Sequence, residues 1–267
     1  MRRLLINIAL YLFCSLLAYG QNYLQQADTP HLANYIEVGI NPILEMVAVQ
    51  GGTFMMGCTS EQSSDCDDCE KPAHEVTVSS FYIGKYEVTQ AQWRSIMVNN
   101  PSPSHFKGDS LPVEQVSWDD VQEFIHKLNE QTGKQYRLPT EAEWEFAARG
   151  GVKSNGNKYS GSNNLEDVAW YSKNSENITH PVGQKQSNEL DIYDMSGNVW
   201  EWCNDWFGNY SNKAQTNPQG HSFGLYRIYR GGSWYSYSRL VRVSYRISSS
   251  SADRDYCLGF RLACSSK

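Results

Sequence analysis

The sequence predicts a single loop-rich domain in which short strands and helices surround a core of aromatic rings. Its 267 residues suit one large domain or two ordinary ones, and we favour one domain with a substantial core. Eight tryptophans and 17 tyrosines accompany 20 glycines, which indicates rings in the core and many turns. Segments with the period of a strand are followed by capped segments with the period of a helix.

The net charge of the chain argues against one class of partner, nucleic acids. The net charge is -6, and the arginines are scattered along the chain. A nucleic-acid backbone requires a basic face on its protein partner. We therefore expect no nucleic-acid partner.

The N-terminal 20 residues have the pattern of an export signal. Arg2 and Arg3 precede an apolar run from Leu4 to Ala18, and Ala18 and Gly20 are small residues suited to cleavage. The run is short for a membrane span, so an uncleaved anchor is the less favoured alternative. We expect an exported protein (periplasmic, cell-surface or secreted) with no membrane span after signal removal. Residues 21–45 are expected to form a leader on the domain surface, and 46–267 the folded domain.

Cysteines that follow the signal favour disulfides, because an exported chain meets an oxidising environment. Cys58, Cys66 and Cys69 are expected to form a loop staple with one spare thiol. For Cys257 and Cys264 we expect a structural disulfide, with Cys203 as a further candidate. The sequence leaves the connectivity open.

The first half of the predicted domain begins with strands. Residues 46–57 are typical of strand, glycine turn and strand, and residues 75–86 alternate as one further strand. Thr89 then caps a helix that runs to about Val98.

Two longer helices follow, each with a capping residue. Ser117 caps a helix that ends at Thr132 and Gly133, and Thr140 with Glu143 forms a capping box for a helix closed by Gly150. The glutamates at 141, 143 and 145 are interpreted as structural partners of the helix dipole rather than as catalytic groups.

The segment from Tyr193 to Trp206 combines an acidic glycine turn with a strand. Trp200, Trp202 and Trp206 alternate with polar residues, which predicts a strand with an aromatic inner face. Asp194 and Glu201, with backbone carbonyls near Gly197, are oxygen donors suited to calcium. A tight turn whose carboxylates cap backbone amides remains the alternative.

A series of short motifs runs from residue 46 to the C-terminus. The motifs are Gly51-Gly52-Thr53-Phe54, Tyr86-Glu87-Val88-Thr89, Pro112-Val113-Glu114-Gln115-Val116-Ser117-Trp118, Arg137-Leu138-Pro139-Thr140-Glu141-Ala142-Glu143-Trp144-Glu145, Gly197-Asn198-Val199-Trp200-Glu201-Trp202, Arg230-Gly231-Gly232-Ser233-Trp234 and Leu258-Gly259-Phe260-Arg261. Together and in this order they resemble the sulfatase-modifying factor family, which is the formylglycine-generating enzyme family. The resemblance implies a single irregular α+β domain with a C-type-lectin-like core, low in regular secondary structure.

The resemblance also implies two calcium sites and a copper site, and the ligands of the second calcium site, near Val168 to His180, are not assigned. It assigns calcium to Asp194, Gly197, Val199 and Glu201, with the glycine and valine acting through their carbonyls. The family's copper is held by two thiolates beyond Gly-Gly-Ser, and cuprous ion requires soft sulfur ligands. Ser236 and Val241 stand at those positions, so we expect no copper. The vestigial catalytic region is Ser233, Ser236, Val241 and Trp200.

The tail from Tyr235 to Tyr256 has the composition of a recognition surface, in which rings supply contact area and hydroxyls supply hydrogen bonds. We predict binding residues Trp234, Tyr235, Tyr237, Arg239 and Tyr245, and a solvated loop is the alternative. Three functions compete. We favour a calcium-stabilised binding or scaffold protein for an extracytoplasmic protein, peptide or glycan. The alternatives are an oxidase that converts a sulfatase cysteine to formylglycine or performs a related oxidation, and a lectin-like ligand-binding protein diversified by a retroelement.

Overall fold

The computed structural model describes residues 32–37, 39–100 and 102–266. The predicted export signal lies outside the described residues, as does residue 101. One compact unit begins at Asn34. Part of the predicted leader therefore belongs to the domain, because β1 (Tyr35–Glu37) pairs with β2 (Leu44–Val49) and Leu44 is buried.

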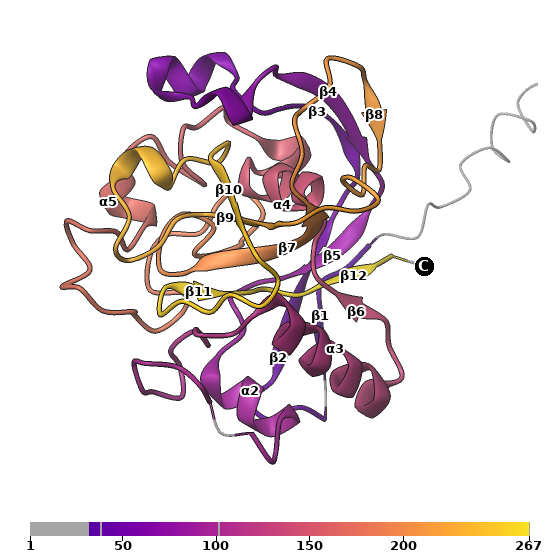
Figure 1. The fold of residues 1–267 in the computed structure, drawn as a ribbon, viewed down its shortest axis with the longest axis vertical. Coiled ribbons are helices and arrows are strands. Elements are labelled where there is room, and N and C mark those ends of the chain that lie inside the picture. The colour runs from indigo at the N-terminus through magenta and orange to yellow at the C-terminus, as the bar shows by residue number, and fades with distance from the viewer. Residues whose placement is uncertain (1–31, 38, 101, 267) are drawn as a thin grey trace, which may run out of the picture. The chain divides into compact units, whose positions relative to one another are not determined.

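A five-stranded sheet joins the two ends of this unit (Figure 1). Its strand order is β1, β2, β5 (Phe81–Gly84), β12 (Ala263–Ser265) and β6 (Tyr136–Arg137). All of these neighbours pair in antiparallel fashion. The C-terminal strand β12 thus lies between β5 and β6, which come much earlier in the chain.

Two smaller sheets complete the strand architecture. One has the order β10 (Arg246–Ser249), β9 (Arg227–Arg230), β7 (Trp200–Trp206) and β11 (Leu258–Gly259). The other has the order β3 (Gly52–Met56), β4 (His74–Val78) and β8 (Gln215–Thr216).

The prediction of one strand over residues 75–86 was wrong. The chain leaves the extended ladder at Ser79 and Ser80, so β4 pairs with β3 whereas β5 pairs with β2 in a different sheet. The strand–turn–strand prediction for 46–57 holds for both strands, although β2 and β3 also lie in different sheets.

The predicted helices and their caps are confirmed. They are α2 (Gln90–Ile96), α3 (Trp118–Thr132) and α4 (Glu141–Ala148), each with a capping box at its N-terminus, and α5 (Leu165–Val168) is an additional short helix. Short 3-10 helices occur at η1 (Ser60–Asp65), η2 (Asp68–Glu70), η3 (Gly151–Lys153) and η4 (Ser238–Leu240). None of the helices in the described part of the chain has the length and apolar character needed to cross a membrane.

Strand β7 is buried on both faces, which corrects the expectation of one polar face. Trp202 on one face is fully buried, and so are Glu201 and Cys203 on the other. Trp200 and Trp202 each pack edge-on against Tyr229, with ring centroids 5.3 Å apart. The strand is therefore a central core element whose charged residue requires a buried partner.

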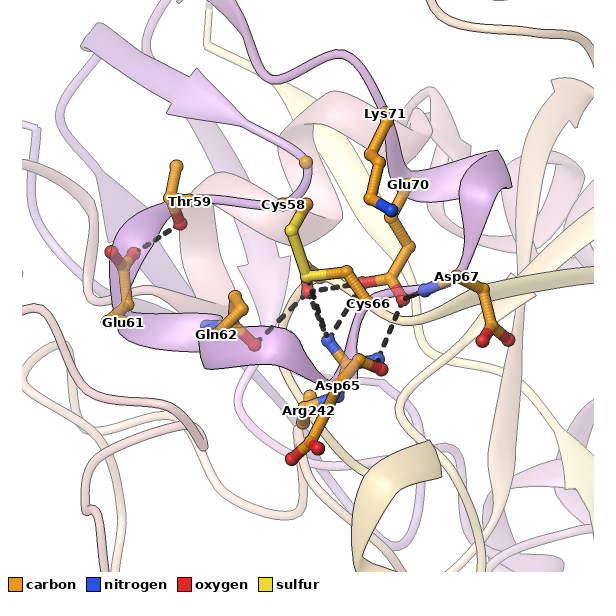
Figure 2. Close-up of a disulfide and its surroundings, with 12 residues drawn as sticks. Cys58, Thr59, Glu61, Gln62, Asp65, Cys66, Asp67, Glu70, Lys71 and Arg242 are labelled. Atoms are coloured by element: carbon orange, nitrogen blue, oxygen red, sulfur yellow. Dashed lines mark hydrogen bonds and ion pairs between the residues drawn. A yellow bond between two sulfur atoms is a disulfide. The ribbon is translucent and has the colours of Figure 1, made fainter.

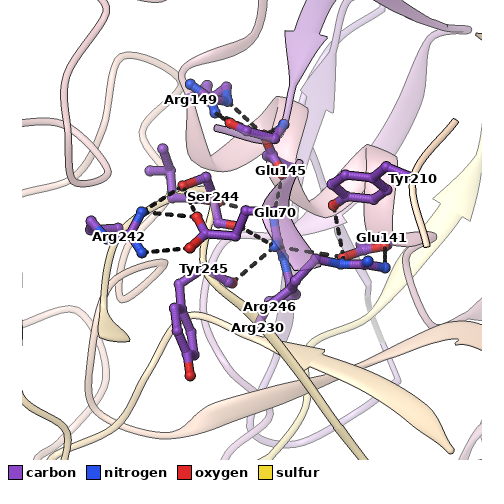
Figure 3. A network of polar contacts seen from close by, with 12 residues as sticks. Glu70, Glu141, Glu145, Arg149, Tyr210, Arg230, Arg242, Ser244, Tyr245 and Arg246 are labelled. Atoms are coloured by element: carbon purple, nitrogen blue, oxygen red, sulfur yellow. Dashed lines mark hydrogen bonds and ion pairs between the residues drawn. The ribbon is translucent and has the colours of Figure 1, made fainter. Parts of the chain in front are cut away.

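Helix α4 occupies the centre of a buried network of ion pairs (Figure 3). It contacts β3 and β4 of one sheet and β7 and β9 of another. Both carboxylate oxygens of Glu141 accept hydrogen bonds from Arg246, each at 2.7 Å. Glu145 pairs with Arg230 and also accepts a hydrogen bond from Arg149 at 2.9 Å. Glu141 and Glu145 are thus buried partners of arginines, which is a different structural role from the expected interaction with the helix dipole.

A second buried pair lies beside the disulfide (Figure 2). Arg242 donates to both oxygens of Glu70, at 2.7 and 2.8 Å. Burial acts to raise the pKa of Glu70, but the hydrogen bonds from Arg242 and Ser244 outweigh it and leave the pKa lowered. The ionised pair therefore ties η2 to the chain just before β10.

The cysteine predictions are confirmed in part. Cys58 and Cys66 form a disulfide, and Cys69 is the spare thiol. The expected disulfide among the other cysteines is wrong, since Cys203, Cys257 and Cys264 are free thiols. Cys203 lies in the core and Cys264 on β12, so different elements hold them.

Replacing Glu145 with glutamine is predicted to lower the free energy of unfolding by about 3–5 kcal/mol. The substitution keeps the shape but removes the nearest buried carboxylate of Arg230 and one of the two carboxylates that Arg149 contacts, leaving Glu141 at 3.6 Å from Arg230 and Glu61 beside Arg149. Urea denaturation measures the effect. The control is Glu123→Gln, which breaks an exposed pair with Lys127 and should change the free energy by about 1 kcal/mol or less. Equal effects of the two substitutions would contradict the role assigned to the network.

Candidate functional site

The segment after Gly231 contains the vestigial catalytic region. Ser233, Ser236 and Val241 are all buried. The Ser236 hydroxyl accepts a hydrogen bond from the Ser233 backbone amide at 3.0 Å, and the two hydroxyl oxygens lie 3.1 Å apart. A Cβ atom at Gly232 would lie only 2.3 Å from Val241 Cγ1, so the valine packs directly against the glycine backbone. This region is closed by packing and carries no pair of thiols.

One cysteine does reach this region. The Cys257 thiol interacts with the Ser233 hydroxyl, and burial raises its pKa above the ordinary range. Cys264 lies instead on β12, where it is paired with Tyr136 and Tyr82. The structure therefore brings a single protonated thiol to the region, and this is not the donor set that cuprous ion requires.

The predicted binding residues separate into an exposed group and a buried group. Tyr235 and Tyr237 are 61% and 70% exposed, and the Arg239 side chain is also exposed. We call these three residues the tyrosine surface. Trp234 and Tyr245 are buried. The Trp234 ring packs edge-on against the Tyr235 ring, with the ring centroids 5.3 Å apart.

Glu114 is a buried acid that sequence reasoning missed. Its Oε1 accepts a hydrogen bond from the Phe106 amide at 2.9 Å, whereas Oε2 has no partner. Burial raises the pKa of Glu114 to about 7. In the sequence Glu114 precedes the cap of α3 in an irregular segment, and nothing there signals that its carboxyl is buried.

The acidic turn is joined to the Gly-Gly-Ser segment by backbone hydrogen bonds. The Gly197 amide donates to the Gly231 carbonyl at 2.9 Å, and the Trp234 amide donates to the Asn198 carbonyl at 2.7 Å. Gly197 has φ 87°, and a Cβ there would lie 2.2 Å from the Trp170 carbonyl oxygen. Glycine is therefore required at this turn.

The carboxylates at and near this turn differ in their hydrogen-bond donors. Both oxygens of Glu201 accept hydrogen bonds from Arg261 at 2.6 Å, and Trp144 also donates to Glu201 at 2.6 Å. Asp194 Oδ2 accepts from the Gly183 amide at 2.7 Å. Glu87, which was not a predicted ligand, accepts from the Val199 amide at 3.0 Å.

Negative charge exceeds positive charge in this buried cluster. Glu87, Asp194 and Glu201 face the single guanidinium of Arg261. Burial, and then repulsion from Asp194 and Glu201, raises the pKa of Glu87 well above its usual range. Burial likewise raises the pKa of Asp194 to about 6. A proton or a cation can relieve such an excess.

The predicted calcium ligands fit that ion unequally. Asp194 and the carbonyls of Gly197 and Val199 supply the oxygen atoms that calcium prefers. Glu201 fits poorly as arranged, because Arg261 and Trp144 hold its oxygens. In the described ranges, no group of three or more His, Cys, Asp or Glu side chains is arranged to hold a metal ion. A cation at this turn would depend on backbone oxygens.

The chain is similar in sequence to known proteins. The family model described as the sulfatase-modifying factor enzyme 1-like domain matches residues 36–266. The chain is 37% identical over 251 residues to the chaperone protein LppX of Paenibacillus barcinonensis, covering 75% of this chain and 82% of LppX. It is 28% identical over 308 residues to the formylglycine-generating enzyme of Mus musculus, covering 92% and 81% of the two chains.

The fold is also similar to that of a solved structure. Treponema denticola variable protein 1 superposes with a TM-score of 0.79 and 30% sequence identity, covering 89% of this chain and all of that one. The likeness confirms the predicted α+β fold, a single C-type-lectin-like domain of the formylglycine-generating enzyme type.

Asp194→Asn is predicted to stabilise the metal-free protein above pH 6 and to have no effect near pH 3. The folded-state pKa of Asp194, about 6, lies above the value of about 3.9 expected in the unfolded chain. Stability is therefore lost as pH rises between these values, by up to about 3 kcal/mol, and asparagine removes that loss. Urea denaturation in EDTA at several pH values measures it, with exposed Asp109→Asn as the control. A difference that is independent of pH would contradict the assignment.

Proposed function

The chain belongs to the family of sulfatase-modifying factor enzyme 1-like domains, and we propose that it is an exported binding domain without the formylglycine chemistry. One observation carries this proposal. Within the segment 233–241, Ser236 and Val241, which stand where the family resemblance places the two copper thiolates, are buried, while Tyr235, Tyr237 and Arg239 are exposed. The segment is thus built to present side chains rather than to hold copper.

The tyrosine surface supplies the chemistry of recognition. Tyrosine offers a large amphipathic contact area with few rotatable bonds, and arginine offers five donors. The buried Trp234 ring fixes the base of this surface, since its indole donates to the Tyr256 carbonyl at 3.3 Å. We propose an extracytoplasmic protein, peptide or glycan as the partner, and the ring-rich composition favours a protein or peptide.

Calcium is proposed as a structural ion at the acidic turn. The support is the excess of buried carboxylates around Asp194 together with the carbonyls of Gly197 and Val199. An ion there would neutralise the charge that burial makes unfavourable and would stabilise the turn that contacts the Gly-Gly-Ser segment. Its role is to stabilise the scaffold and not to take part in a reaction.

Calcium is predicted to raise the melting temperature of the EDTA-treated protein. A hundredfold excess over Kd contributes about 2.7 kcal/mol, which corresponds to roughly 5–10 °C for a domain of this size. Asp194→Asn should remove the shift, whereas magnesium should produce little of it because it prefers rigid octahedral sites. Differential scanning calorimetry measures all three cases. An identical melting temperature in EDTA and in calcium would argue against the ion.

Loss of the tyrosine surface is predicted to reduce partner binding. Biotinylated protein would capture partners from an extracytoplasmic fraction, and quantitative mass spectrometry would compare the variants. Tyr235→Ala/Tyr237→Ala should lower retention of the partner by at least about tenfold, because two exposed anchors are lost. Tyr226→Ala removes an exposed tyrosine elsewhere and should have no effect. Equal retention by both variants would exclude this surface.

An oxidase is the second candidate, and the observation that favours it is the Cys257 thiol beside Ser233. We predict that the protein, given copper, oxygen and a Cys-X-Pro-X-Arg peptide, produces no aldehyde, because one thiol cannot replace a thiolate pair. Mass spectrometry of the peptide measures this, with a formylglycine-generating enzyme as the positive control. Aldehyde that disappears in Cys257→Ser would establish the enzyme.

Retroelement diversification is the third candidate. Its support is the likeness to a structure named variable protein 1. A near-copy template repeat of the 233–256 region beside a reverse transcriptase in the genome would establish it. Without such a repeat, the tyrosine surface is a fixed feature of this chain.

A further inference from the structure

A cavity of about 470 Å³ lies apart from the tyrosine surface and the acidic turn. The end of β7, the start of α4, His74 of β4 and the segment 208–221 form its walls. Its volume is within the range of about 300–1,000 Å³ that is typical of small-molecule sites. None of the residues assigned above to the calcium turn or the tyrosine surface lines it.

The charged side chains in the cavity wall, Glu141 and Arg246, form an ion pair with each other (Figure 3). Arg246 donates to both oxygens of Glu141 at 2.7 Å, and its remaining nitrogen donates to the carbonyls of Gly208 and Cys69 at 2.8 and 3.1 Å. The Tyr210 hydroxyl donates to Glu141 at 3.1 Å. This wall therefore offers neither a free cation for an anionic ligand nor a free anion for a cationic one.

Asp205 is buried in the same wall and adds no net charge at neutral pH. Its Oδ2 accepts a hydrogen bond from the Glu141 amide at 2.9 Å. Burial, and then the nearby Glu141 carboxylate, raises the pKa of Asp205 to about 8. A protonated carboxyl can both donate and accept hydrogen bonds.

The other polar residues of the lining also combine donors with acceptors. Amides and hydroxyls come from Asn209, Ser211, Gln215, Thr216 and Gln219. His74 also lines the cavity, and its Nδ1 lies 3.2 Å from the Pro72 carbonyl, which can only accept, so Nδ1 carries the proton of this hydrogen bond. Met56, Trp206 and Tyr210 supply the apolar part of the lining.

We propose that this cavity binds a neutral saccharide. Each sugar hydroxyl can donate and accept hydrogen bonds, so it can pair with the amide, hydroxyl and imidazole groups of the lining. The C–H faces of a sugar ring can pack against the apolar residues of the cavity. The internally paired Glu141 and Arg246 disfavour charged ligands. The proposal is independent of the tyrosine surface, so either site can fail without the other.

The test uses the full chain against immobilised di- to tetrasaccharides, with neutral, sialylated and sulfated members, followed by calorimetry with the neutral sugar that binds best. We expect a Kd of about 1 mM or tighter for at least one neutral sugar. Gln219→Trp, which fills the cavity from an exposed position, should weaken binding by at least about tenfold. Lys213→Trp, exposed in the same segment but outside the lining, should leave binding unchanged.

Thermal melting of each variant shows whether it remains folded. Binding of charged sugars alone, no binding of any neutral sugar at about ten times that Kd, or equal binding by the two tryptophan variants would each overturn the proposal. If Gln219→Trp does not fold, Gln215→Trp on the exposed strand β8 takes its place with the same expected loss.

Discussion

Buried arginine–glutamate pairs hold together a domain that has little regular secondary structure. Arg230 of β9 and Arg246 of β10 bind Glu145 and Glu141 of α4, so one short helix joins neighbouring strands of the same sheet. Arg242 and Arg261 extend the same principle to Glu70 and Glu201. Removing one partner of such a pair leaves a charge in a low-dielectric interior, which is strongly unfavourable. These ion pairs therefore fix the relative positions of segments that are not held together by strand pairing.

The pairs also fix the two ends of the Gly-Gly-Ser segment. The segment begins after Arg230 and ends at Arg242, and both guanidiniums are fully buried. Within the segment Ser233, Trp234, Ser236 and Val241 are buried, whereas Tyr235 and positions 237 to 239 are exposed. The buried positions 236 and 241 carry serine and valine, and the exposed positions include tyrosine and arginine.

Features specified by local sequence were predictable, and features specified by distant partners were not. Thr89, Ser117 and Thr140 identified three helix starts because a cap acts within three residues. The Cys58–Cys66 bridge lies within one loop. By contrast, the polar face of β7 is buried because Arg261, 60 residues away, neutralises Glu201. The orphaned oxygen of Glu114 and the neutral carboxyl of Asp205 likewise depend on segments that periodicity cannot place together.

The most direct test measures the affinity for cuprous ion by competition with a chromophoric chelator. It compares the wild-type chain with the double variant Ser236→Cys/Val241→Cys and asks whether the fold can hold copper once both thiols are present. Cysteine is smaller than the valine that packs on Gly232 and nearly isosteric with the serine beside Ser233. The account predicts no binding tighter than about 1 µM for the wild-type chain and a gain of at least about a hundredfold for the double variant. Sub-micromolar affinity in the wild-type chain would contradict it.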